Sequence, residues 1–274
     1  MLTGDWLSLY VLWAVTVALI VAGCRPITDR QLERWAVRLG VLVKGDHERW
    51  ARAQLRRARA IRWTAFALGL NIGALPMYMN VIDVDRAGDF ANAAVAIAPF
   101  AGAALGSVIA EIALFQRRPN RRAATLTIRH WRDYVDRVWI IAIAAAVPLS
   151  AIAALVGSAR ADDVSRLVWF GPLVCVVSLL AVTLGVRIVV NRPVVVDGAG
   201  ARRIDDALRA DGAHHIAGAA IALSAFALTG TLGHTLWSGV VAIVFALVPF
   251  LALGVWHGLA TTRWNVDQAR LQHA

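Results

Sequence analysis

The stretch WIIAIAAAVPLSAIAALV, residues 139–156, contains no charged side chain and decides the fold class. A helix of about 20 apolar residues crosses a hydrocarbon core of about 30 Å and satisfies its own backbone hydrogen bonds. The stretch also lacks the alternation of apolar and polar residues that a membrane β-strand requires. It therefore predicts a transmembrane helix.

Similar stretches recur along the chain, and they predict an all-α polytopic membrane helix bundle with about seven transmembrane helices. The predicted spans are residues 6–24, 63–82, 90–114, 139–156, 167–190, 216–232 and 236–259. The composition agrees, because 59% of the 274 residues are hydrophobic and only 17% are charged, more apolar surface than a soluble domain could bury. We expect a first helix with a basic, amphipathic cytoplasmic segment (1–62), followed by a six-helix membrane bundle with a short cytoplasmic tail (63–274).

The basic residues lie mainly in alternate connections between these spans. Segments 25–62, 115–137, 191–213 and 260–274 hold 11, 7, 4 and 2 Arg and Lys residues, whereas the opposite connections hold only Arg86, Arg160 and Arg166. Because basic loops stay in the cytoplasm, this bias predicts a multi-pass protein of a bacterial inner membrane with its N-terminus outside and its C-terminus in the cytoplasm. The net charge of +10 is thus explained by orientation, and we expect no nucleic-acid partner.

The first cytoplasmic segment contains a helix signature. Residues 28–31, TDRQ, form a capping box, and Gly40 is a plausible helix end. One helical face carries the apolar residues Leu32, Trp35, Ala36 and Leu39. We expect this helix to lie in the headgroup layer of the bilayer on anionic lipids, or to dock a membrane or cytoplasmic protein partner. A second basic helix is predicted from about Asp46 into the second span.

Three ionisable residues fall inside predicted spans: Glu111, Arg187 and His257. Such residues are costly in lipid and are therefore functional candidates. All three lie near the predicted cytoplasmic ends of their spans, so they could meet and relay protons or bind a charged solute. The structural alternative is that Arg187 extends to the headgroups and Glu111 pairs with an arginine.

Other patterns favour packing over chemistry. Small-residue faces and one amide are expected to pack helices together, at Gly69, Asn71, Gly73, Gly102 and Gly106. Arg-Pro follows the first, third and fifth spans, and the last two copies are 74 residues apart, which indicates repeated helical hairpins or merely a shared stop signal. Residues 198–200 are interpreted as a flexible turn. No catalytic motif occurs, so we predict no enzyme activity, metal or cofactor.

The loop sequences at 124–137, 191–193 and 203–209 resemble those of uncharacterised multi-pass integral membrane proteins of actinobacteria. This resemblance extends over spans three to seven and implies a bacterial membrane location, but no residue role. Two functional classes fit the sequence. One is a small permease or membrane subunit of a transport system, and the other is a non-transporting scaffold or signalling protein that acts through its basic cytoplasmic face.

Overall fold

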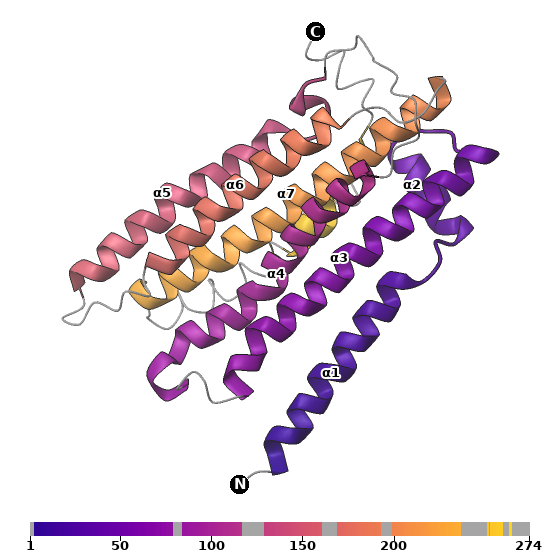
Figure 1. Ribbon diagram of the computed structural model, residues 1–274. Coiled ribbons are helices and arrows are strands. Elements are labelled where there is room, and N and C mark those ends of the chain that lie inside the picture. The colour runs from indigo at the N-terminus through magenta and orange to yellow at the C-terminus, as the bar shows by residue number, and fades with distance from the viewer. Residues whose placement is uncertain are drawn as a thin grey trace.

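The computed structural model describes residues 3–78, 84–116, 129–160, 169–192, 199–236, 251, 253–259 and 263–264, and these residues contain helices and no strand (Figure 1). The elements are α1 (Thr3–Cys24), α2 (Asp29–Arg38), α3 (Asp46–Tyr78), α4 (Val84–Gln116), the 3-10 turn η1 (Trp131–Asp133), α5 (Arg137–Arg160), α6 (Phe170–Asn191) and α7 (Ala199–Leu236).

The central helix of the bundle is α7, which contacts α4, α5 and α6 (Figure 1). On the other side of α4, α3 packs along it, and α1 packs against α3. Many of the buried positions of α7 are alanines, including Ala210, Ala213 and Ala217, which are fully buried. Small side chains let neighbouring helices approach closely, so this alanine-rich face explains the central position of α7.

Three described helices are long and apolar enough to cross a membrane, at Arg137–Ala159, Phe170–Asn191 and Gly200–Leu232. A fourth span is obtained if α1 and α2, which meet at an angle of 74°, are counted as one bent pair. The third predicted span corresponds to α4, which contains the shorter apolar stretch Ile97–Ala113. Residues 63–78 of the second predicted span form the C-terminal half of α3, continuous with the basic helix that precedes them, and residues 79–82 lie outside the described residues. Residues 237–250 of the seventh predicted span lie outside the described residues.

The helix α2 has the predicted cap but different surroundings from those expected. The Thr28 side chain accepts a hydrogen bond from the Gln31 backbone, and the Gln31 side chain accepts one from the Thr28 backbone at 3.1 Å. Leu32 and Trp35 are buried against α3 and α7 residues in the protein core. Protein therefore covers the apolar face of α2, whereas the position of this helix in the headgroup layer stays a prediction.

The helix α7 begins much earlier than the sixth predicted span. It starts at Ala199, so residues 199–213, which the sequence predicts as part of a cytoplasmic loop, are helical. Gly200 lies in the first turn of α7 and not in a flexible turn, whereas Gly198 is outside the described residues. Hydropathy predicts the end of a span where charged residues begin, but four charged residues of this part of α7 are buried: Asp205, Asp206, Arg209 and Asp211.

The predicted packing glycines lie mostly at the contact between α3 and α4. A Cβ atom on Gly69 would overlap the carbonyl of Ala98, and one on Gly102 would overlap the carbonyl of Ala65. Gly106 likewise lies against α3, and Gly73 is half-buried on α3. Asn71 donates a hydrogen bond of 2.6 Å to the Thr16 hydroxyl on α1.

The predicted repeat pairs α4 and α5 as one hairpin with α6 and α7 as the other, and these two hairpins are not packed alike. Helices α6 and α7 run along each other, whereas among the described residues α4 and α5 share no comparable contact, because α6 and α7 lie against α5 instead. Arg118 and Pro119 lie outside the described residues. The structure thus offers no equivalent packing that would support the repeat.

Candidate functional site: a buried charge network beside a cavity

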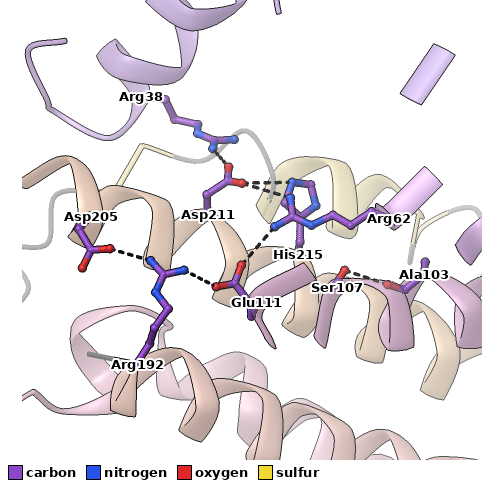
Figure 2. Close-up of polar contacts among 9 residues, drawn as sticks. All are labelled: Arg38, Arg62, Ala103, Ser107, Glu111, Arg192, Asp205, Asp211 and His215. Atoms are coloured by element: carbon purple, nitrogen blue, oxygen red, sulfur yellow. Dashed lines mark hydrogen bonds and ion pairs between the residues drawn. The ribbon is translucent and has the colours of Figure 1, made fainter. Parts of the chain in front are cut away.

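A chain of buried ion pairs joins α4, the end of α6 and α7 (Figure 2). The Arg192 guanidinium donates to Glu111 Oε2 at 3.0 Å and to Asp205 Oδ1 at 2.8 Å. Asp205 also accepts a hydrogen bond of 2.9 Å from Arg209 Nε, and Arg209 donates to the Val189 carbonyl at 2.6 Å. The exposed fraction of each of the four charged side chains is 4% or less. Buried charges are tolerated only when paired in this way.

A second group of ion pairs surrounds Asp211 of α7. Arg38 of α2 donates to Asp211 Oδ1, and Arg62 of α3 donates to Asp211 Oδ2 at 3.2 Å. His215 Nε2 lies 3.8 Å from the same carboxylate. The Arg62 guanidinium also lies 3.7 Å from Glu111 Oε1, so it connects the two groups (Figure 2).

The spacing along α7 sets the direction of each group. Asp205 and Arg209 are four residues apart and share one face, as do Asp211 and His215. At about 100° per residue, Asp205 and Asp211 face roughly 120° apart. One pair therefore meets the end of α6, and the other meets α2 and α3.

The ion-pair partners of Arg192 stabilise its positive charge. Burial by itself would lower the pKa of its guanidinium, but Glu111 and Asp205 outweigh this effect and raise the pKa above its usual value. Arg192 is therefore always cationic, and it tethers the end of α6 to both α4 and α7.

A cavity of about 790 Å³ adjoins the Asp211 group. Polar and charged residues line one part of it: Gln31, Arg38, Arg59, Arg62, Asp211, His215 and His257. Apolar residues line the rest: Ile27, Trp35, Leu55, Trp63, Phe66, Phe100, Ala103, Leu253 and Trp256. A pocket of this size with a few convergent polar groups is typical of a small-molecule site.

The three ionisable residues predicted from the sequence are not brought together. Glu111 is buried and pairs with Arg192, and His257 is exposed and lines the 790 Å³ cavity. Arg187 is exposed and lines a different cavity of about 550 Å³ beside Ile112. Glu111 approaches the larger cavity only indirectly, through Arg62.

The sequence does not reveal which residues form the charge network with Glu111. Segment 191–213, which is predicted to be a cytoplasmic loop, contains four of them: Arg192, Asp205, Arg209 and Asp211. One signal could have found them: residues 205 and 209, and residues 211 and 215, repeat charged or titratable groups at i,i+4 spacing, which indicates that the helix continues. Gly212 allows α7 to pack closely against Glu111, because a Cβ atom at that position would overlap the Glu111 carboxylate.

Comparison with known proteins gives no further assignment. The chain matches no family model, no curated protein and no solved structure.

Proposed function

We propose that this protein is a seven-helix membrane protein of a bacterial inner membrane that binds a solute in the 790 Å³ cavity, as a small permease or as the membrane subunit of a transport system. The cavity is the observation that carries this proposal, because it combines a volume suited to a small molecule with charged groups and aromatic walls.

The arrangement of the basic segments supports an orientation with the N-terminus outside and the C-terminus in the cytoplasm. The described parts of the basic segments, including α2, η1 and the start of α7, lie at one end of the bundle (Figure 1). Trp264 also lies there, donating from its indole to the Asp133 carbonyl at 2.8 Å and from its backbone to the Arg38 carbonyl at 3.0 Å. On this orientation, the charged part of the cavity is near the cytoplasmic surface.

The buried ion pair between Glu111 and Arg192 favours the second candidate function, a scaffold or signalling protein. This pairing leaves Glu111 with a structural role, as expected of a solid bundle that presents a basic face to a protein partner. The two candidates differ in whether water enters the cavity.

Cysteine accessibility separates the two candidates. Cys24 and Cys175, the two cysteines of the chain, are first replaced by alanine. His257 belongs to the polar part of the cavity lining, whereas Leu251 on the same segment is 67% exposed and is absent from the lining. A membrane-impermeant thiol reagent added to inside-out vesicles should therefore label His257→Cys and leave Leu251→Cys, which faces lipid, unlabelled. Equal protection of both cysteines would remove the solute-binding proposal and leave the scaffold.

A further inference from the structure

We propose that the cavity binds one amphiphile with a phosphate headgroup of net negative charge, with the headgroup against Arg38, Arg59 and Arg62 and a hydrocarbon chain along the aromatic wall. This inference rests on the proposed function, because it names the class of solute for the same cavity.

The charged part of the cavity has an excess of positive charge. Three guanidinium groups line it, from Arg38, Arg59 and Arg62, against the single carboxylate of Asp211. Glu111 offsets part of the charge of Arg62, but its carboxylate lies 3.7 Å from the Arg62 guanidinium and also accepts a hydrogen bond from Arg192. The lining therefore favours an anion.

Two of these guanidinium groups, those of Arg38 and Arg62, keep donors that the described protein does not use, whereas each guanidinium nitrogen of Arg59 already donates within the protein. Nε of Arg38 and Nε of Arg62 are buried and have no hydrogen-bond partner among the described residues. Buried donors without partners are costly, so both guanidinium groups have hydrogen-bonding capacity that the described protein does not satisfy. Arginine forks match phosphate oxygens in geometry as well as in charge.

The remainder of the cavity is suited to a hydrocarbon chain and not to water. Phe66 and Phe100 make an edge contact with ring centroids 5.9 Å apart, and Phe100 makes another with Trp256 at 6.0 Å. All three residues line the cavity, together with Trp63 and Ala103. An aromatic wall offers water few hydrogen-bond partners, so it is filled most favourably by an apolar group.

The volume excludes a small anion as the full occupant. A water molecule occupies about 30 Å³ in the liquid, so an inorganic phosphate would fill only a small part of about 790 Å³. A headgroup joined to an acyl chain uses both the cationic corner and the aromatic wall.

Gln31 allows the headgroup site to be tested without damage to the fold. Its side chain lines the cavity and lies 3.4 Å from Arg59 Nη1, and it also closes the capping box of α2. Glutamate serves equally well at this capping position, so Gln31→Glu adds a negative charge to the site while α2 stays capped. Arg34→Gln is the matched control, because it lowers the net charge by one on the same helix but away from the cavity lining.

The experiment is native mass spectrometry of the purified protein after incubation with phosphatidylglycerol, lysophosphatidylglycerol, phosphatidylcholine or inorganic phosphate. We expect one retained phosphatidylglycerol or lysophosphatidylglycerol on the wild type and on Arg34→Gln, with at least about tenfold weaker retention on Gln31→Glu. Ala103→Leu, which fills the aromatic part, should weaken retention of both lipids. Preference for the one-chain lipid would identify a single-chain solute, and preference for the two-chain lipid would identify a bilayer lipid.

Other outcomes would overturn the inference. Equal retention of phosphatidylcholine, or equal retention by Gln31→Glu and Arg34→Gln, would exclude the cationic headgroup site. Binding of inorganic phosphate without lipid, insensitive to Ala103→Leu, would exclude the hydrocarbon chain. Either result leaves the proposed function intact if His257→Cys is still labelled, so the two failures are distinguishable.

Discussion

Arg192 Nη1 donates a hydrogen bond of 3.0 Å to Glu111 Oε2, although the two residues are 81 positions apart in the sequence. Both side chains are buried, and Arg192 also contacts Asp205, so one guanidinium fixes α4, the end of α6 and α7 relative to one another. A buried ion pair is weak evidence for net stability, but removal of one partner leaves an uncompensated charge.

Arg192→Met should destabilise the protein strongly, by about 3–5 kcal/mol, because it leaves the Glu111 carboxylate buried without its main partner. Glu111→Gln should cost less, about 1–3 kcal/mol, since Arg192 keeps its bond to Asp205. The free energy of unfolding in mixed detergent and SDS measures both. Equal losses for the two variants would show that Asp205 does not hold Arg192 in the absence of Glu111.

Gly102→Ala should destabilise the contact between α3 and α4 by about 1–3 kcal/mol, because the new methyl group would overlap the Ala65 carbonyl. Gly200→Ala is the control, since no atom lies within 4 Å of a Cβ at that helical position. It should be neutral or stabilising by up to about 1 kcal/mol. Thermal unfolding of the two variants in the same detergent tests the prediction, which fails if their midpoints shift together.

Leu32→Ala should lower the free energy of unfolding by about 2–5 kcal/mol, because Leu32 is 5% exposed and packs in the protein core. Val37→Ala, on the same helix but 63% exposed, should have an effect within about 0.5 kcal/mol. Unfolding curves in detergent distinguish the two. If α2 were instead held mainly by lipid, both variants would unfold like the wild type once the bilayer is removed.

Orientation can be tested with single cysteines in intact cells. In the cysteine-free background, a membrane-impermeant thiol reagent should label Asp85→Cys, near the start of α4, and should leave Arg203→Cys, near the start of α7, unlabelled. Inside-out vesicles should give the opposite pattern. Labelling of Arg203→Cys in intact cells would reverse the proposed orientation.

Loss of the hydrogen bond between Asn71 and Thr16 should weaken the attachment of α1 only modestly. Such bonds between membrane helices contribute about 0.6 kcal/mol on average and up to about 1.7. A double-mutant cycle with Asn71→Ala and Thr16→Ala should therefore give a coupling energy in that range. A coupling energy near zero would mean that the bond to the Ala67 carbonyl satisfies Asn71 by itself.

The sequence by itself determined the all-helical class, the apolar helices and the capping box of α2, because hydropathy, periodicity and capping depend on residues close together in the chain. Only the tertiary structure decided what those helices bury. The sequence predicts a solvated loop for Arg192, Asp205 and Asp211, but in the structure these residues are buried and have partners on α4, α3 and α2. The sequence also predicts a buried charge at Arg187, whose side chain is exposed in the structure. Burial of a charge depends on partners distant in the sequence, and hydropathy along the chain does not contain that information.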